Sequence, residues 1–483
     1  MRLTVHKVFF AVLFISLFLM TLRPVTDPDF WWHLRTGELI SQTHSIPHID
    51  PFSFTNNGKP WVAHEWLSEL FMYGLFQLGN YWLLIFIFSL IITVSFFLAY
   101  LRCPVESRPY IAGFIILLGA IAAAPTWGVR PQMISLFLTS LFLYLLTRYR
   151  QADKLIFLIP LPFITLLWAN LHAGYLMGLC VVAIYIIGGL IEFIVSEVFT
   201  KKNSAAPSIK SIFILSVVLI ISLLAVLVNP NGVFILVYPF QTLSSQAMQQ
   251  LIQEWFSPDF HQLMWQPLAW FILAFIGAGM LGKKSISITK ILLTLAFGYA
   301  ALSSVRHVPL FTVVAIPILA EQIDSFVRVR GEVQAPNRLL YVVTPILLFC
   351  LLLITSLRFI QVVKGQGKSE TGTFPKVAVD WIEKNQPAGN IFNSYGWGGY
   401  IIWRLYPEYP VFIDGRADVY GDKFIFDYTD LYRANPGWEQ ILTENSVHLV
   451  LVEPESNLAS ALLQSTEWDV VFQDKISILF IKK

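Results

Sequence analysis

The sequence predicts a mainly α-helical protein that crosses a membrane many times and ends in a small α/β domain. Two observations predict this fold class. Of the 483 residues, 56% are hydrophobic and only 13% are charged, whereas a water-soluble chain carries roughly 25% charged residues to cover its surface. The apolar residues also gather in runs of about 17 or more, the length that a helix needs to cross hydrocarbon about 30 Å thick. A net charge of +2 argues against nucleic-acid binding.

The apolar runs predict about eleven membrane-spanning helices. The first run ends in Leu-Arg-Pro, without the small residues of a signal-peptide cleavage site, so we interpret it as a retained helix. Cys103, Cys180 and Cys350 have the spacing of neither a zinc site nor a disulfide framework. The predicted spans are 7–24, 81–101, 109–125, 132–149, 155–171, 175–196, 211–229, 266–282, 286–302, 308–322 and 340–358.

Basic residues predict the orientation, because the cytoplasmic connectors of membrane proteins are enriched in lysine and arginine. With the N-terminus in the cytoplasm, the outer connectors between the later spans carry only Arg130 and Arg306. The chain is then a multi-pass protein of the cell membrane, with a transmembrane domain over 1–360 and an extracytoplasmic α/β domain over 361–483. The inner connectors carry Arg102, Arg108, Arg148, Arg150, Lys154, Lys201, Lys202, Lys210, Lys283, Lys284, Lys290, Arg328, Arg330 and Arg338.

The long first outer loop, over 25–80, begins with a dense group of ionisable residues. Residues 27–37 are DPDFWWHLRTG, which places Asp27, Asp29, His33 and Arg35 beside hydrocarbon, where unpaired charge is costly. In a helix that starts near Asp29, His33 lies one turn further on the same face. The alternative is that Asp27 caps this helix and that Asp29 faces its dipole.

A second segment of this loop, residues 61–67, is WVAHEWL. It predicts an amphipathic helix on the membrane surface, with Trp66 and Leu70 on one side and Glu65 and Glu69 on the other. His64 and Glu65 lie either on a solvated face of that helix or in a second polar group that returns toward Asp29.

Other outer helix ends carry polar residues that topology alone does not explain, since topology keeps arginine away from this side. They are Arg130, Asn170, His172, Arg306 and His307. The alternative for each is interfacial capping or a buried hydrogen-bonded pair. The connector at about 230–265 predicts a surface helix or a lid over a lipid.

The tail has the composition of a water-soluble domain. A predicted helix over 374–385 and helical segments between short β-rich runs indicate a small α/β domain, which we interpret as an acceptor-binding or stabilising cap. Its densest motifs are GWGGY at 396–400 and DGRAD at 414–418; the second predicts a tight turn or contacts with an acceptor. The β-rich runs are 390–393, 411–413, 447–452, 468–472 and 476–481.

These features together resemble the GT-C glycosyltransferases, polytopic enzymes that take a sugar from a polyprenyl-phosphate carrier at the outer membrane face. The shared features are an aspartate directly after the first helix, a long first outer loop with amphipathic helices, about eleven spans and a folded outer tail. The stretches at 27–37 and 61–67 are similar to those of a bacterial, mostly uncharacterised branch of that superfamily.

The resemblance implies inverting transfer of a hexosyl or pentosyl group from a polyprenyl-phosphate donor to a glycan, lipid or protein acceptor. It also implies that the protein contacts membrane lipids. Asp29, or else Asp27, would be the general base, since partial burial raises a carboxyl pKa toward working pH. Cationic groups would meet the leaving phosphate. The expected donor-phosphate contacts are Arg130, Arg306, His172 and His307, and the expected substrate contacts are His33, Arg35, His64, Glu65 and Asn170.

The second outer loop departs from the family pattern. Many GT-C enzymes carry there an acidic residue tied to a divalent metal, but residues 126–132 include Arg130 and no carboxylate. The sequence therefore requires no cofactor. His33, His64 and Glu65 are compatible with a divalent metal, although their spacing does not demand one.

Two other functions fit a polytopic chain of this kind. A transporter or flippase of lipid-linked saccharide would carry ionisable residues near mid-membrane, where these spans are almost free of charge. In a non-catalytic assembly subunit, the group around Asp29 would be incidental. Sugar transfer compared between the wild type and Asp29→Asn separates these functions.

Overall fold

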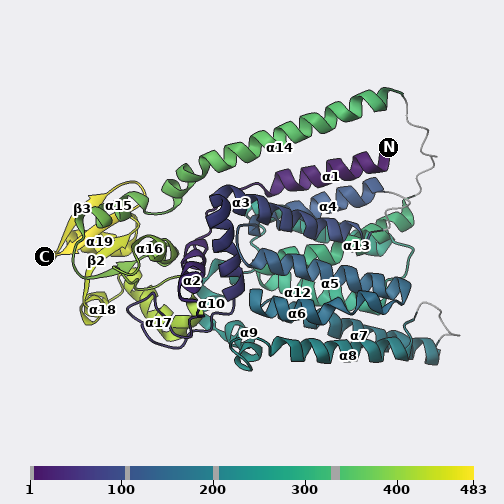
Figure 1. The fold of residues 1–483 in the computed structure, drawn as a ribbon, viewed down its shortest axis with the longest axis horizontal. Coiled ribbons are helices and arrows are strands. Elements are labelled where there is room, and N and C mark those ends of the chain that lie inside the picture. The colour runs from purple at the N-terminus through teal and green to yellow at the C-terminus, as the bar shows by residue number, and fades with distance from the viewer. Residues whose placement is uncertain (1–4, 104–108, 200–205, 328–337) are drawn as a thin grey trace.

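The computed structural model describes residues 5–103, 109–199, 206–327 and 338–483. Figure 1 shows a bundle of roughly parallel helices, with a small α/β domain beyond one end and the N-terminus at the other. The mainly helical, polytopic fold class is confirmed. Parts of three predicted inner connectors, at 104–108, 200–205 and 328–337, lie outside the described residues.

Each predicted span coincides with a helix of the bundle. Among the described residues, seven helices are long and apolar enough to cross a membrane, namely those containing α3, α4, α7, α8, α11, α13 and α14. The helices α1, α6 and α12 are shorter and apolar, so eleven crossings remain a prediction. The bundle consists of α1 (Val5–Thr21), α3 (Trp66–Tyr100), α4 (Pro109–Ala123), α5 (Gln132–Ala152), α6 (Pro160–Leu171), α7 (Tyr175–Phe199), α8 (Ile209–Val226), α11 (Gln266–Leu281), α12 (Ile288–Ser303), α13 (Val308–Phe326) and α14 (Arg338–Thr373).

Helix α13 forms the centre of the bundle, because it is the most buried of the seven and packs against α3, α4, α5, α11 and α12. Small residues allow its neighbours to approach closely. A Cβ atom on Gly119 of α4 would lie 2.6 Å from Ile316 Cδ1 of α13. Helices in lipid associate through such close packing, since the hydrophobic effect does not favour one apolar neighbour over another there.

Helix α3 contains both a surface arm and a span. Asn80 has a left-handed φ of 52° and a non-helical ψ, which divides the helix into an arm over 66–79 and a span that begins at Tyr81, as the sequence predicts. The side chains of Glu65 and Glu69 are 4% and 1% exposed. The alternative of a solvated acidic face is therefore wrong.

The tail forms a four-stranded sheet in the order β1-β2-β4-β3, with β1 parallel to β2 and the other pairs antiparallel. The predicted run 411–413 is a pair of single bridges rather than a full strand. Val411 pairs with Ile391 of β1 and with Ser53 of the first outer loop, so that this loop extends the sheet edge. The tail consists of α15 (Lys376–Asn385), β1 (Asn390–Asn393), α16 (Gly398–Leu405), α17 (Ala417–Tyr432), α18 (Trp438–Glu444), β2 (Val447–Val452), α19 (Asn457–Gln464), β3 (Trp468–Gln473) and β4 (Ile478–Lys482).

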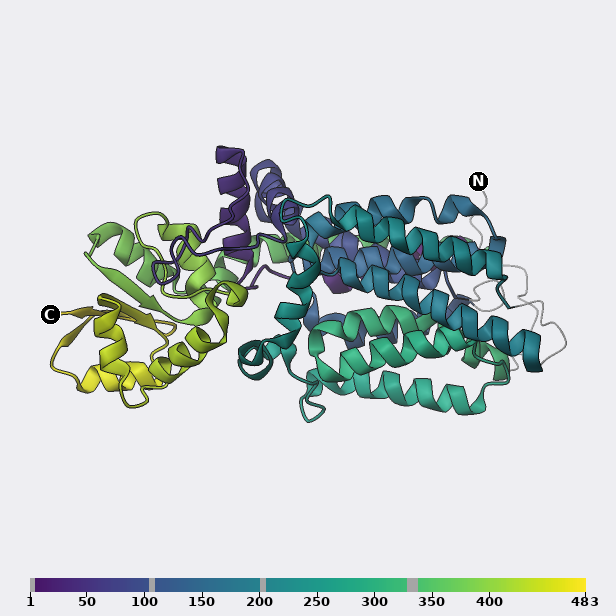
Figure 2. The ribbon, with the colours of Figure 1, turned by 90° about the horizontal axis from the view of Figure 1, so that it is seen from below.

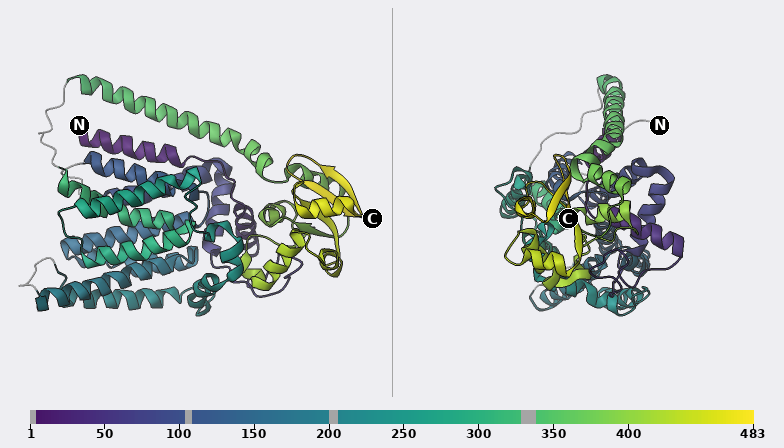
Figure 3. Two further views of the ribbon diagram at one scale, coloured as in Figure 1. Left: turned by 180° about the vertical axis from the view of Figure 1, so that it is seen from behind. Right: turned by 90° about the vertical axis from the view of Figure 1, so that its left-hand side faces the viewer.

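Three further helices lie between the bundle and the sheet (Figures 2 and 3). They are α2 (Phe30–Thr43), α9 (Phe234–Ser244) and α10 (Gln246–Leu251). Helix α10 packs Ala247 and Met248 into the core of the tail domain. Helix α14 continues to Thr373, beyond the predicted domain boundary at 360, and thereby connects the bundle to the tail.

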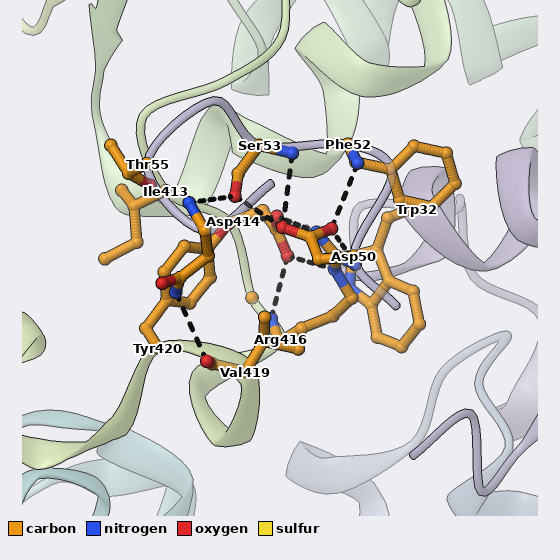
Figure 4. Close-up of polar contacts among 12 residues, drawn as sticks. Trp32, Asp50, Phe52, Ser53, Thr55, Ile413, Asp414, Arg416, Val419 and Tyr420 are labelled. Atoms are coloured by element: carbon orange, nitrogen blue, oxygen red, sulfur yellow. Dashed lines mark hydrogen bonds and ion pairs between the residues drawn. The ribbon is translucent and has the colours of Figure 1, made fainter. Parts of the chain in front are cut away.

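A buried ion-pair network joins the tail to the first outer loop (Figure 4). Arg416 Nη1 lies 2.8 Å from Asp50 Oδ1, and its Nε and Nη2 donate to the two carboxylate oxygens of Asp414 at 2.8 and 2.6 Å. The guanidinium stacks on Trp61 and Phe52, with its Cζ 4.6 and 5.0 Å from the ring centroids. All three charged side chains are almost completely buried.

Substitution Arg416→Ala should destabilise the protein by about 3–5 kcal/mol, because it leaves the carboxylates of Asp50 and Asp414 buried without their cation. The loss should appear as a lower thermal unfolding midpoint in detergent micelles. Arg433→Ala, on the exposed surface of the same domain, is the control and should leave the midpoint unchanged. Equal midpoints for the two variants would contradict this role.

Candidate active site

A cavity of about 640 Å³ lies where the bundle end, the first outer loop and the tail meet. Its wall combines residues at 27–33 and 61–69, the ends of α5, α7 and α13, parts of α9 and α10 with the segment 252–255 that follows them, and two tail segments at 395–396 and 415–418. Segments from almost the full length of the chain thus converge on one space. Of the predicted site residues, the wall includes Asp27, Asp29, His33, His64, Glu65, His172, Arg306 and His307.

Asp29 stands at the N-terminus of α2, in the position that precedes Phe30. Trp32 Nε1, one turn along the helix, donates to Asp29 Oδ1 at 3.1 Å. Among the residues that the structure describes, no donor binds Oδ2 by a hydrogen bond. Burial, together with the neighbouring charge of Asp27, raises the pKa of Asp29 to about 7. Asp29 is therefore a carboxyl with one oxygen held in place and a pKa suited to a base at neutral pH.

Asp27 has a different set of contacts. Its Oδ1 accepts a hydrogen bond from the Asp29 backbone N–H at 2.9 Å, and its Oδ2 lies 3.1 Å from Arg130 Nε. The first contact precedes α2, whose N-cap residue is Asp29 and not Asp27. Burial raises the pKa of Asp27, and Arg130 opposes this effect. An arginine partner makes Asp27 a poorer candidate base than Asp29.

Arg130 connects the second outer loop to the connector between α10 and α11. It forms ion pairs with Asp27 and with Glu254, and its Nε also donates to Gln132 Oε1 at 3.0 Å. Glu254 lines the cavity, whereas Arg130 lies just behind the wall. The sequence predicts a surface helix or lid for the segment of Glu254 and indicates no chemistry for this residue; its acidic side chain beside Trp255 is the only signal.

Arg306 is the second arginine at this end of the cavity. Its guanidinium stacks on Trp255, with Cζ 4.6 Å from the ring centroid. Within the described ranges, no ion pair or hydrogen bond joins its guanidinium to another side chain. His307, beside it in the wall, has a buried Nδ1 that lacks a partner among the described residues. Arg306 is thus a cation at the cavity whose hydrogen-bond donors are available to a ligand.

Glu65 lies at the centre of a histidine cluster, formed by His33, His64 and His172. Glu65 Oε1 lies 3.3 Å from His64 Nε2 and 3.2 Å from His172 Nε2, while Oε2 lies 3.5 Å from His33 Nε2. Burial favours a neutral Glu65, but the three histidines outweigh it and hold its pKa well below the usual range. The cluster therefore contains a stable carboxylate anion.

The hydrogen bonds of His172 define its tautomer. Its Nδ1 accepts from the Gly174 backbone N–H at 2.8 Å, so the ring proton is on Nε2 and points to Glu65. Burial lowers the pKa of His172 to about 3, which keeps the ring neutral. The position of His172 thus favours a role in holding Glu65 over the predicted contact with a donor phosphate.

Two residues of this cluster and the neighbouring Glu69 are arranged as candidate metal ligands. His33, Glu65 and Glu69 each offer one donor atom, and these atoms lie within 4.8 Å of one another. Glu69 Oε1 lies 3.4 Å from His33 Nδ1, while its buried Oε2 has no hydrogen-bond partner among the described residues. An imidazole with two carboxylates is a donor set that divalent ions accept, so these residues fit such an ion. The sequence predicts an acidic helix face that includes Glu69 but does not identify Glu69 as a site residue.

Two of the predicted substrate contacts lie outside the cavity wall. Arg35 pairs with Glu38 and donates to the Trp403 carbonyl of α16 at 2.7 Å, so it anchors the tail instead. Asn170 accepts from Trp66 Nε1 at 3.0 Å and donates to the Val228 carbonyl at 3.0 Å, so it connects helix ends. The predicted substrate contacts of Arg35 and Asn170 are therefore not supported.

The tail contributes residues to the cavity that the sequence alone does not predict there. Asp418, in the first turn of α17, forms a hydrogen bond with the Tyr238 hydroxyl of α9. The Tyr238 ring stacks near His64, with centroids 4.3 Å apart. Gly415 lies against Asp29. The DGRAD motif at 414–418 thus divides into a buried ion pair, formed by Asp414 and Arg416, and two cavity residues, Gly415 and Asp418.

Comparison with known proteins relates this geometry to a solved fold. No protein-family model and no curated protein matches the sequence. Two solved structures of ArnT from Cupriavidus metallidurans are similar over 98% of this chain and 97% of theirs, at 12% sequence identity. The TM-score is 0.51 for the structure bound to undecaprenyl phosphate and 0.54 for the apo state. ArnT is a polytopic membrane glycosyltransferase of the GT-C type, so the GT-C-like fold predicted from the sequence is confirmed.

Proposed function

We propose that this chain, which has the fold of ArnT, is a membrane glycosyltransferase that moves a sugar from a polyprenyl-phosphate carrier to an acceptor hydroxyl. One observation carries the proposal: the cavity combines Asp29, whose Oδ2 has no partner among the described residues, with Arg306, whose donors are available. A base and an anion-binding cation are the two groups that such a transfer needs. The similar ArnT structure with undecaprenyl phosphate supports the class of donor.

The proposed step uses Asp29 as the base. The acceptor hydroxyl transfers its proton to Asp29 Oδ2 as its oxygen attacks the anomeric carbon of the donor. The new glycosidic bond forms while the bond between the anomeric carbon and the phosphate oxygen breaks, and the electron pair leaves on the phosphate. Attack from the side opposite the phosphate inverts the anomeric configuration. Trp32 keeps Oδ1 engaged, which directs the other oxygen toward the acceptor.

The donor phosphate is placed at the arginine end of the cavity. Arg306 offers hydrogen-bond donors, and His307 lies beside it. Arg130 pairs with Glu254, a carboxylate that occupies the position of an anionic ligand. We assign Glu254 as a resident counter-ion that a phosphate replaces at Arg130, because both are anions that match the guanidinium.

A divalent ion is an optional component. It would be held by His33, Glu65 and Glu69, and when bound it would supply positive charge that polarises a substrate oxygen. The chain's own groups perform the proton transfer and the phosphate binding described above.

The transporter and assembly-subunit alternatives are tested by one comparison. Asp29→Asn should lower sugar transfer from labelled polyprenyl-phosphate sugars by roughly 10²–10⁴-fold, since it removes the base. Asp427→Asn, an exposed aspartate on α17, is the matched control and should retain wild-type transfer. Equal transfer by Asp29→Asn and wild type would exclude Asp29 as the base. If the wild type transfers from none of the donors tested, the transporter or assembly function is favoured.

The counter-ion assignment is tested by Glu254→Gln, which removes the charge and keeps the shape of the side chain. Polyprenyl phosphate should bind this variant at least roughly fivefold more tightly, because a unit charge at 4 Å contributes about 1 kcal/mol even in bulk water. Isothermal titration or ligand-dependent thermal shift measures the change. Glu439→Gln on the exposed face of α18 is the control. Weaker binding by Glu254→Gln would show that Glu254 supports the site instead.

We also propose a location in the cytoplasmic membrane, with the N-terminus in the cytoplasm and the tail outside. The N-terminus and the tail lie at opposite ends of the bundle (Figures 1 and 3), as an odd number of crossings requires. Alkaline phosphatase fused to Lys483 should be active in whole cells, and a fluorescent protein fused there should remain dark, because these reporters work on opposite sides of the bacterial membrane. The reverse pattern would overturn the orientation.

A further inference from the structure

One loop of the tail domain lies directly on the carboxylate assigned as the base. A Cβ atom placed on Gly415 would lie 1.7 Å from Asp29 Oδ1, 2.8 Å from Asp29 Cγ and 3.3 Å from Trp32 Nε1. Atoms cannot approach so closely, so any side chain at position 415 must displace either the carboxylate or the loop. The Gly415 backbone thus covers one face of Asp29.

Position 415 is a glycine because there is no room for a Cβ atom, and not because the backbone has a left-handed φ. Gly415 is not among the glycines with a left-handed φ, which are Gly58, Gly232, Gly389, Gly421 and Gly437. Its φ therefore lies outside the left-handed range that an alanine rarely adopts. The position is therefore restricted by Asp29, a residue nearly four hundred positions earlier in the chain.

The GWGGY motif, which the proposed function leaves unexplained, makes the same kind of contact. A Cβ atom on Gly399 would lie 2.5 Å from the Pro28 carbonyl oxygen and 3.2 Å from Trp32 Cδ1. A Cβ atom on Gly398 would lie 2.1 Å from the Ile413 carbonyl oxygen. Two glycine-containing motifs of the tail therefore bring backbone against the segment that carries Asp29.

The loop is held rigidly in this position. Arg416, the next residue, forms the buried ion pairs with Asp50 and Asp414 (Figure 4), and the Tyr395 hydroxyl donates to the Gly415 carbonyl at 3.2 Å. Asp50 belongs to the first outer loop, as Asp29 does, so the clamp fixes the Gly415 backbone relative to the same segment that presents the carboxylate.

We propose that the C-terminal domain completes the catalytic centre, with Gly415 and Arg416 acting as positioning residues that hold the Asp29 carboxylate against the cavity. The proposal rests on the proposed function in taking Asp29 as the base. Gly415 excludes water from one face of the carboxylate, and Trp32 engages its Oδ1. The remaining oxygen faces the acceptor. This burial also accounts for the raised pKa of Asp29.

Gly415→Ala tests the positioning role, with Gly367→Ala as the matched control. Gly367 lies in α14 and has no atom within 4 Å of its Cβ position. Gly415→Ala should lower kcat roughly 100-fold, since a displacement of about 1 Å at a reacting group has that effect, while polyprenyl-phosphate binding changes little. Gly367→Ala should match the wild type in both. A wild-type kcat for Gly415→Ala, in an enzyme that Asp29→Asn inactivates, would overturn the positioning role and leave the base assignment intact.

A second readout does not depend on sugar transfer. Infrared difference spectra should show a protonated carboxyl that loses its proton near the pKa of about 7 in the wild type and is absent from Asp29→Asn. In Gly415→Ala this titration should move to lower pH, because the displaced carboxylate meets more water. Tyr395→Phe, which only removes the hydroxyl that holds the Gly415 carbonyl, should give a smaller shift in the same direction. An unchanged titration in both variants would refute the proposal.

Discussion

Arg416 has almost no exposed surface, and neither do its two carboxylate partners. Removing three charges from water costs several kcal/mol for each ion, so the arrangement is tolerated only where the geometry satisfies all of them together. Asp414 belongs to the tail and Asp50 to the first outer loop. The network is therefore complete only when those two parts of the chain are in contact. The single bridge between Ser53 and Val411 joins the same two parts of the chain, and both parts contribute residues to the cavity wall.

Within the cavity, charge is divided so that two neighbouring aspartates take different roles. Asp27 forms an ion pair, because Arg130 lies beside its Oδ2. Asp29 instead accepts a hydrogen bond from the Trp32 indole and lies against the Gly415 backbone, and neither of these groups carries a charge. The two aspartates therefore differ in role because their surroundings differ: Asp27 is the counter-ion of Arg130, and Asp29 is the candidate base. Glu65 is a third case, since three histidines hold it as an anion deep in the same wall.

Much of this organisation could be predicted from the sequence, for identifiable reasons. The long helices of the bundle were predictable because hydrocarbon imposes a length and a composition, and the strands at 390–393 and 447–452 match β1 and β2. The position of Asp29 in the cavity wall was predictable because its segment is the first to leave the bundle; its role as the base stays a prediction. The direction in which a side chain points could not be predicted. Arg35 points to α16, and Asn170 points to neighbouring helix ends. Gly415, Glu69 and Asp418 could not be assigned to the cavity, because their roles arise from contacts between segments that are distant in sequence.

The Gly415 contact also has a consequence for biosynthesis. A ribosome delivers Asp29 to the membrane with the first helix, whereas the loop that covers it emerges only after the last span has been made. On the proposed assignment, the nascent chain carries an ordinary, hydrated aspartate throughout translocation and acquires its base only when the tail folds onto the first loop. On that assignment, catalytic competence is the final event of assembly, and a chain whose tail has not folded onto the first loop would be a membrane-inserted but inert protein.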